Sequence, residues 1–549
     1  MRGVGVALES VLKFQKKIFF LLAFLTGMVV LSNYSDFQVA VAQGDHGRDL
    51  YAFKRVLEGA VPYRDFSWLF GPLMAYYYAF FFKLCGVSIQ SALLGQNILI
   101  LLTGMVMYLA CARLLTPTWG FLCALMYWAL RGSEFFYTYN HSGGILCIVL
   151  VAYAFFRYVQ DASLRHVALG FGVMFLFMLI RLNMACALLA VWAGALICLD
   201  ILRKDPRLGL KVRVYVYGGA ACLALAVFVY WLYFRGQPLY VLWESFPLSK
   251  AQRTDEAGVM ASLHYLIIVL YRLMTSSFMW AGIMVCLFGG VMKLLLTLTR
   301  KDLFPERERI GMGVTLLFLA GTVAATLHEF LLSGIDYRLY WAFPSTVLLM
   351  IFVLGHAVAG PRYRVVRGVL YATVFWIAVL TLQGALAQAR SSRTPAHLLQ
   401  RGQNRVYTTQ EAVWYVTVGQ ACDFIAKNVP AGEKLFTMPF DTLYNYLTGR
   451  DQPTRQWVYF QHMIIPEEQE RQVIQDLERE KVNWVLVSNR AISIEGGLGL
   501  LGRDYCTVLW KYIDKNYQPA ARFGQWSSSP SWAWNHGVII FKRKVPFAH

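Results

Sequence analysis

The feature that most constrains this chain is a series of apolar segments, each long enough or nearly long enough to cross a membrane. A transmembrane helix needs about 20 predominantly apolar residues. The chain is 57% hydrophobic and only 15% charged, a balance typical of many-span membrane proteins and rare among soluble domains. These observations predict a polytopic α-helical membrane protein with about 11–13 spans. The segments are 18–33, 91–112, 117–131, 142–158, 166–181, 184–200, 213–234, 277–298, 311–332, 342–358 and 366–387.

Basic residues indicate how the spans are oriented. Most of the excess positive charge, +19 for the whole chain, lies in short runs beside the apolar segments. Such runs usually mark the cytoplasmic side of a membrane protein, so the charge needs no nucleic-acid partner. The N-terminus is then cytoplasmic, and the chain from about residue 390 is extracytoplasmic. The runs lie at 13–17, 203–213, 293–309 and 362–367, and the longer outer connections at 34–67, 132–141, 235–276 and 333–341.

One further apolar stretch, 68–86, does not fit this count as a span. An odd number of crossings must separate residue 34 from residue 203, and the five segments between 91 and 200 already provide it. Its helical part runs from Pro72 to Gly86 and would rise about 22 Å, less than the ~30 Å hydrocarbon core. We therefore expect a juxtamembrane helix; if it crosses instead, one of the later segments does not.

The remaining chain, 391–549, has the pattern of a small extracytoplasmic α/β domain. Strand-like runs at Lys434–Met438, Trp484–Ser488 and Gly537–Phe541 alternate with helical patterns at 411–428, 466–481 and 501–515. This order predicts an open sheet with helices packed on it. Two of the ten cysteines, Cys422 and Cys506, lie here, and in an oxidising compartment they could pair. We assign residues 1–390, including a first outer loop at 34–90, to a separate transmembrane domain.

The first outer loop carries an unusual number of charged and aromatic residues. A helix over 45–58 would bring Asp45, Arg48 and Asp49 together, because they are spaced i, i+3 and i+4. Gly59 and Pro62 would end it before Tyr63, Arg64 and Asp65. From these residues alone, the charges are either solvated on an amphipathic surface helix or part of a reactive site.

Other polar residues fall on the same predicted side of the membrane. A surface on which arginines lie beside carboxylates and aromatic rings suits a substrate with a phosphate head and a long hydrocarbon chain. The donor-phosphate candidates are Arg338, Arg181, Arg64 and Arg48, and the other substrate-site candidates are His46, Asp49, Tyr63, Asp65, Glu134, Asn140, His141, Asp336 and Tyr337.

The first outer loop also resembles a known family. The sequence from Asp45-His-Gly-Arg through Pro62-Tyr-Arg-Asp-Phe to Phe70-Gly-Pro-Leu73 is similar to the corresponding loop of GT-C-fold glycosyltransferases, which include bacterial protein mannosyltransferases and aminoarabinose transferase-like enzymes. The resemblance implies a GT-C-like fold in a bacterial inner membrane. It also implies transfer of a sugar from a polyprenyl-phosphate donor with inversion, and Asp45 as the general base.

The chain departs from this family at two places. His46 stands where protein mannosyltransferases have a second acidic residue, which leaves the acceptor open among lipid, glycan and protein. The second outer loop offers Glu134 with Asn140 and His141, too few oxygen ligands to indicate a metal. We therefore expect neither a cofactor nor a metal centre.

Two other classes of membrane protein stay open. A lipid-carrier flippase or transporter would carry polar residues deep within several spans, and this chain's spans are almost entirely apolar. A surface-polysaccharide polymerase or ligase would have a large central outer loop, whereas here the polar bulk is C-terminal.

Overall fold

The computed structural model describes most of the chain, and the outer connection 235–276 is described only in part. The residues described are 2–32, 37–38, 44–134, 139–245, 260, 263–264, 267–268, 278–299, 305–333, 336–359, 361–391, 398–407, 413–459, 466–489, 501–526 and 536–547.

The chain divides into two compact units, each built from separated stretches of sequence. Unit 1 contains residues 1–33, 97–230 and 251–386, and unit 2 contains residues 34–96, 231–250 and 387–549. The first outer loop thus shares a unit with the C-terminal chain.

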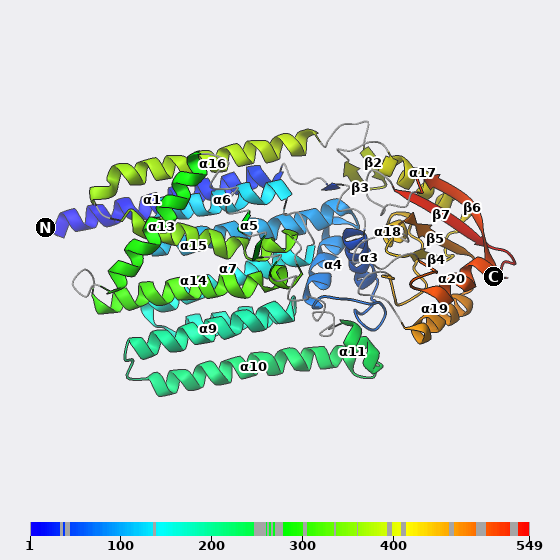
Figure 1. The fold of residues 1–549 in the computed structure, drawn as a ribbon, viewed down its shortest axis with the longest axis horizontal. Helices are drawn as coiled ribbons and strands as arrows, with labels where there is room; N and C mark the ends of the chain where they lie inside the picture. Colours follow the sequence, from blue (N-terminus) through cyan, green and yellow to red (C-terminus); the bar gives the residue numbers. More distant parts are fainter. Residues whose placement is uncertain are drawn as a thin grey trace. The chain divides into compact units, whose positions relative to one another are not determined.

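Unit 1 consists of helices (Figure 1). Of these, α9 and α14 pack together extensively, as do α7 and α8, α13 and α15, and α1 and α6. The helices α5, α10 and α16 each run on into unit 2 at one end. The bounds are α1 Arg2–Ser32, α5 Ile89–Leu114, α6 Pro117–Glu134, α7 Tyr139–Asp161, α8 Leu164–Met178, α9 Leu182–Leu202, α10 Leu208–Phe234, α13 Phe278–Thr299, α14 Glu306–Ser333, η2 Asp336–Trp341, α15 Phe343–Ala357, η3 Pro361–Tyr363 and α16 Arg364–Ser391.

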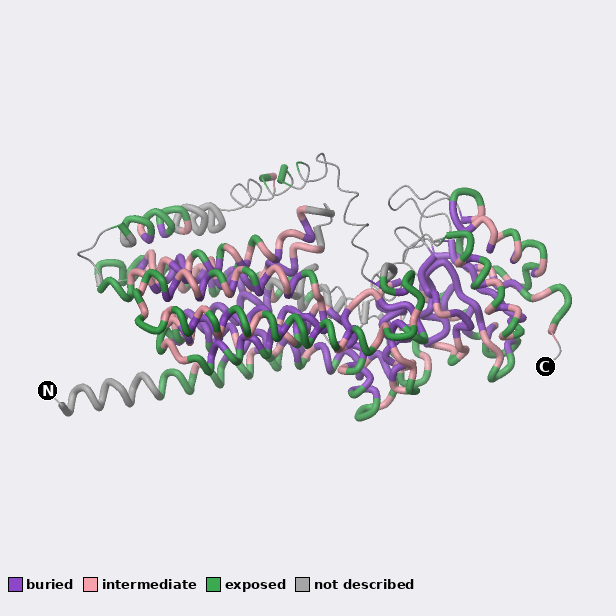
Figure 2. Tube along the Cα trace, turned by 90° about the horizontal axis from the view of Figure 1, so that it is seen from below, coloured by how far each residue is buried: buried purple, intermediate pink, exposed green. Residues whose placement is uncertain are grey.

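Each of the eleven predicted apolar segments forms one of these helices. Within the described ranges, seven helices are long and apolar enough to cross a membrane, namely α1, α5, α7, α9, α10, α14 and α16. Shorter apolar helices include α8 and α15. Figure 2 shows buried, intermediate and exposed residues mixed along the helices, and several helices are exposed over much of their length. The predicted polytopic helical fold class is confirmed, and the chain is a multi-pass membrane protein.

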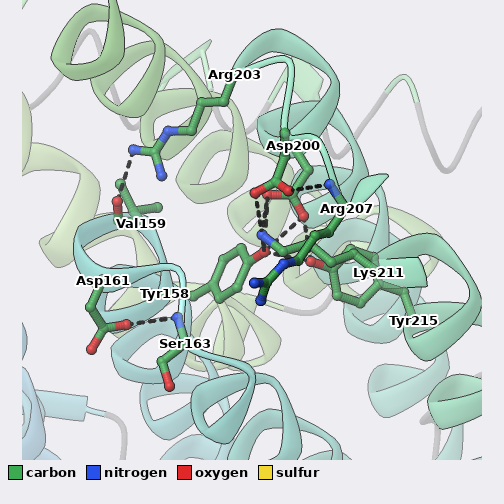
Figure 3. A network of polar contacts seen from close by, with 10 residues as sticks. Tyr158, Val159, Asp161, Ser163, Asp200, Arg203, Arg207, Lys211 and Tyr215 are labelled. Atoms are coloured by element: carbon green, nitrogen blue, oxygen red, sulfur yellow. Dashed lines mark hydrogen bonds and ion pairs between the residues drawn. The ribbon is translucent and has the colours of Figure 1, made fainter. Parts of the chain in front are cut away.

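A buried polar network joins three helices of unit 1 (Figure 3). The Asp200 carboxylate of α9 accepts hydrogen bonds from the Tyr158 hydroxyl of α7, at 2.7 Å, and from the Tyr215 hydroxyl of α10. Lys211 of α10 donates to Tyr158 at 2.8 Å and forms an ion pair with Asp205 at 2.7 Å. Because Lys211 forms ion pairs with both Asp200 and Asp205, the network can be buried, and it fixes the ends of the three helices relative to one another.

Unit 2 is built around a four-stranded mixed sheet in the order β4-β5-β7-β6. The strands β4 and β5 are parallel, with Leu435 beside Trp484, whereas β7 is antiparallel to both β5 and β6. Every residue of β4 and β5 is buried, and Figure 2 shows this core in purple. The elements are β1 Phe37–Gln38, α3 Asp45–Leu57, α4 Leu73–Cys85, α11 Leu239–Ser245, β2 Leu398–Arg401, β3 Asn404–Tyr407, α17 Val413–Asn428, β4 Leu435–Met438, α18 Leu443–Thr448, α19 Glu467–Arg479, β5 Trp484–Ser488, α20 Thr507–Asn516, β6 Tyr517–Gly524 and β7 Gly537–Arg543.

The predicted sheet with packed helices is confirmed in unit 2. All three predicted strands and all three predicted helices form, whereas β6, α18 and the β2–β3 hairpin were not foreseen. Cys422 and Cys506 are both buried free thiols, so they do not pair. Burial raises the pKa of Cys422 to about 12, which keeps the thiol protonated at neutral pH.

The first outer loop forms the two helices that its sequence predicts. The helix α4 begins after Pro72 and ends before Gly86, whose φ is 87°, so its 13 residues span about 20 Å. It packs on α3, where Phe53 stacks on Tyr78 with ring centroids 4.6 Å apart. This packing buries most of α3, which is therefore no solvated surface helix.

Candidate functional site

The first candidate site lies at the start of α3. Gly44 precedes the helix with a φ of 64°, a conformation that glycine adopts easily. Its carbonyl accepts the first helical hydrogen bond, from the Arg48 N–H at 2.9 Å. Asp45 then occupies the first turn, where the partial positive charge of the helix N-terminus favours a carboxylate.

Arg48 divides its guanidinium group between two carboxylates. Its Nε and Nη2 donate to Asp49 Oδ1 at 3.1 and 2.8 Å, and its Nη1 lies 2.9 Å from Asp45 Oδ1. The Asp49 side chain is fully buried, whereas that of Asp45 is 36% exposed. Asp49 therefore fixes the orientation of the arginine, and Asp45 is the member of this group that solvent or a substrate can reach. We call Asp45, Arg48 and Asp49 the carboxylate cluster.

Aromatic rings enclose the arginine of the carboxylate cluster. The Arg48 guanidinium carbon lies 5.8, 5.1 and 5.6 Å from the ring centroids of Trp68, Phe70 and Phe440, within the range of cation–π attraction. Burial lowers the pKa of Arg48, but the charges of Asp49 and Asp45 outweigh this effect and raise the pKa above its ordinary value. The cluster thus contains one permanent cation and two carboxyl groups.

Other predicted residues of the first loop lie nearby in sequence but in different surroundings. His46 is buried in the first turn of α3. Tyr63 is buried and has a φ of 68°. Its hydroxyl donates a hydrogen bond to the Phe70 carbonyl, and its ring packs against that of Phe234 with ring centroids 4.8 Å apart. Arg64 and Asp65 form an exposed pair with a 2.7 Å contact, and the hydrogen bond from Arg64 holds the Asp65 pKa below its usual 3.8.

Unit 1 contains a second candidate site, which we call the Arg181 cluster (Arg181, Asn183, Glu329 and Arg338). Arg181 immediately precedes α9, and its Nη2 and Nε lie 2.6 and 2.8 Å from Glu329 Oε1, near the end of α14. Asn183 Nδ2 donates to the same oxygen at 3.0 Å. Arg338 in η2 is close enough to attract Glu329 electrostatically. Two arginines thus interact with this carboxylate, and arginine is a side chain well suited to binding phosphate.

The predicted residues of the second outer loop and of η2 are described only in part. Asn140 is buried at the start of α7. The next residue, His141, lies against the rings of Tyr340 and Trp341, with ring centroids 4.6 and 4.8 Å apart. Glu134 ends α6, and Asp336 and Tyr337 begin η2, but their side chains lie outside the described part of the structure. Among the described residues, no group of three or more histidines, cysteines and acidic residues could hold a metal ion.

The sequence analysis did not select two of the residues that complete these sites. Glu329 neutralises Arg181 from another helix, and Phe440 covers Arg48 from the C-terminal chain. An acidic residue at the outer end of an apolar segment was the only sequence signal for Glu329. No sequence signal marked Phe440, since a phenylalanine that follows a strand is most often an ordinary core residue.

Comparisons with known proteins bear on the fold. No family model and no curated protein sequence matches the chain. Two crystal structures of ArnT, the aminoarabinose transferase, from Cupriavidus metallidurans are similar to it at 13% identity, each over 95% of this chain and 97% of theirs. The TM-score is 0.60 for the apo state and 0.58 for the state bound to undecaprenyl phosphate. An oligosaccharyltransferase from Archaeoglobus fulgidus aligns over 92% of this chain and 73% of its own at 12% identity, with a TM-score of 0.47, too low to support a conclusion. With the helices and sheet described above, the likeness to ArnT shows that this chain has the GT-C fold.

Proposed function

We propose that this protein is a glycosyltransferase that moves a sugar from a polyprenyl-phosphate donor to an acceptor on the extracytoplasmic face of a membrane. The observation that carries the proposal is the carboxylate cluster, in which a buried arginine holds the half-exposed carboxylate of Asp45. A positioned carboxylate of this kind suits a general base. The GT-C fold supports the reaction class, and the ArnT structure bound to undecaprenyl phosphate supports the class of donor.

In this mechanism, Asp45 accepts the proton of an acceptor hydroxyl or amine as that group attacks the anomeric carbon of the sugar. The new bond forms on the face opposite the lipid phosphate, so the configuration inverts. The bond between the anomeric carbon and the phosphate oxygen breaks, and the lipid phosphate leaves with the electron pair. Arg48 does not contact the substrate in this scheme; its pairing with Asp49 keeps its Nη1 on Asp45.

The leaving phosphate needs positive charge to stabilise it. We assign this role to Arg181 and Arg338, because both interact electrostatically with Glu329 and a guanidinium group suits a phosphate. Arg64 is the less suitable candidate, since Asp65 already pairs with it in solvent. We also propose that residues 391–549 are extracytoplasmic in a bacterial inner membrane, as the basic runs indicate.

The proposal is tested by incubating purified protein in proteoliposomes with cell-envelope extract as the source of acceptor and with a radiolabelled sugar carried either on a polyprenyl phosphate or on a nucleotide. We expect label to leave the polyprenyl phosphate and to stay on the nucleotide, and we expect an Arg181→Gln, Arg338→Gln double variant to transfer more slowly. If the folded protein removes sugar from no lipid-linked donor, the proposal is wrong and the transporter alternative is favoured.

A further inference from the structure

A short segment of the C-terminal chain connects the sheet of unit 2 to the helix that begins at Asp45. This segment, residues 439–448, follows β4 and ends with α18. It belongs to the same unit as α3 and α4, and α18 packs on α3. Some of its side chains contact the sheet and others contact α3, so the segment can fix the position of α3 relative to the sheet.

On the side that faces the sheet, hydrogen bonds hold the segment to the strands β4 and β5. The Asn445 side chain of α18 donates to the Leu435 carbonyl of β4 at 2.8 Å and accepts from the Thr437 hydroxyl at 2.7 Å. The Ser488 hydroxyl, at the end of β5, donates to the Asp441 carboxylate. All of these side chains are buried, so the start of α18 is held as rigidly as the strands themselves.

On the side that faces α3, the segment contacts the first turn of that helix directly. The ring centroid of Phe440 lies 5.6 Å from the Arg48 guanidinium carbon, and the ring is only 6% exposed. Leu443 meets Gly47 so closely that a Cβ on Gly47 would lie 2.7 Å from Leu443 Cβ and 3.0 Å from its backbone nitrogen. Arg48 belongs to the carboxylate cluster, and Gly47 lies between Asp45 and Arg48 in the same helical turn, so one contact reaches the cluster directly and the other reaches the turn that carries it.

Further contacts extend the same interface along α3. The Gln452 backbone N–H donates to the Tyr51 hydroxyl at 2.8 Å. The Tyr51 ring packs on Trp457 with ring centroids 4.8 Å apart, and Trp457 stacks on Phe66 with ring centroids 4.7 Å apart. Residues 440–457 therefore cover α3 and the turn that follows it.

We propose that Phe440 and Leu443 are positioning residues for Asp45, acting through Arg48 and Gly47, so that the C-terminal domain completes the catalytic loop. This inference rests on the proposed function, since it assigns a purpose to the orientation of Asp45. Phe440 keeps the arginine enclosed, and Leu443 keeps the first turn of α3 at a fixed distance from the sheet.

The proposal is tested with Phe440→Ala and with Phe541→Ala as a matched control. Phe541 is similarly buried, 8% exposed, and belongs to the same hydrophobic core, but it lies in β7. We expect Phe440→Ala to lower kcat for sugar transfer by about tenfold to a hundredfold, because a small misplacement of a reacting group costs that much. The KM for the donor should hardly change, and Phe440→Tyr should restore kcat because it keeps the aromatic face over Arg48.

A second measurement does not depend on activity. Hydrogen–deuterium exchange of residues 45–57 should be faster in Phe440→Ala than in Phe541→Ala. Equal losses of kcat in the two alanine variants, or equal exchange rates, would overturn the positioning role. If the wild-type protein transfers no sugar, the proposed function fails, and the exchange rates still decide whether Phe440 holds α3.

Discussion

At the scale of single residues, the same chemical pair occurs twice in the first outer loop with different consequences. Arg48 with Asp49 and Arg64 with Asp65 are both adjacent arginine–aspartate pairs. The first is buried under aromatic rings, and the second has side chains 53% and 33% exposed. A buried charge that loses its partner is costly, whereas an exposed pair contributes little. The sequence contains both adjacent pairs but gives no sign of this difference in burial.

We predict that Asp49→Asn destabilises the protein far more than Asp65→Asn. The Asp49→Asn variant leaves the buried Arg48 with one fewer carboxylate, which typically costs about 3–5 kcal/mol, whereas loss of the exposed pair costs at most about 1 kcal/mol. Thermal unfolding in detergent measures both. Similar midpoints for the two variants would mean that Arg48 is hydrated in the folded protein.

At the scale of elements, local patterns predicted more than long-range contacts did. The apolar helices and the strands β4, β5 and β7 follow from hydrophobic runs and turn residues, which act within a few positions. The strand β6 was missed because Gln518, Pro519 and Arg522 interrupt any apolar pattern, and it forms because β7 pairs with it. The spacing of Asp45, Arg48 and Asp49 predicted their cluster, whereas Glu329 and Phe440 join their sites through contacts between distant segments.

The contact between α3 and α18 yields a prediction about Gly47. Alanine normally favours a helix over glycine by about 1 kcal/mol, but a Cβ at Gly47 would collide with the backbone of Leu443. We expect Gly47→Ala to lower the midpoint of thermal unfolding. Gly368 in α16 has open space around it, so Gly368→Ala should leave the midpoint unchanged or raise it. A stabilising effect at both positions would exclude a tight approach of α18 to α3.

The element pair α19 and α20 yields a prediction about pH. Glu470 of α19 is 3% exposed and accepts a hydrogen bond from the Leu509 N–H of α20 at 2.8 Å. Burial raises the pKa of this carboxyl above its usual 4.5. Because the folded pKa is the higher one, protonation as the pH falls removes the cost of burying the charge. The wild type should therefore gain stability relative to Glu470→Gln as the pH falls through the raised folded pKa toward the usual 4.5.

Glu480 provides the matched comparison, with the opposite sign. Its hydrogen bond from Lys434 holds the carboxyl pKa below the usual 4.5, so its contribution is present above that pH and is lost as the pH falls through the folded value. The wild type should lose stability relative to Glu480→Gln as the pH is lowered. Thermal unfolding of the three proteins from neutral pH to well below 4.5 measures both effects, and shifts of equal sign would contradict the assignment.

At the scale of the whole molecule, the fold was more predictable than its division into units. The GT-C architecture follows from the apolar segments and the first-loop motif. The sequence boundary near residue 390 separates the first outer loop from the C-terminal domain, although both belong to one compact unit. That grouping arises from contacts such as Phe66 with Trp457, which no local pattern encodes.

The proposed orientation also gives a prediction at this scale. A cysteine at exposed Arg207, between α9 and α10, should react with a membrane-impermeant maleimide only after spheroplasts are permeabilised. A cysteine at Asp423, whose side chain is 69% exposed in α17, should react in intact spheroplasts. Labelling of the wild type gives the background from its own cysteines. The reverse pattern would place the C-terminal domain in the cytoplasm.

The central claim is that the carboxylate of Asp45 is the base for sugar transfer, and the rate of transfer by Asp45→Asn tests it most directly. Asparagine keeps the size of the side chain and an oxygen for Arg48, but it cannot take up a proton. We expect kcat to fall by about 10²–10⁴-fold, while Asp423→Asn, an exposed substitution in the same unit, transfers sugar at the wild-type rate. Full activity of Asp45→Asn would contradict the account.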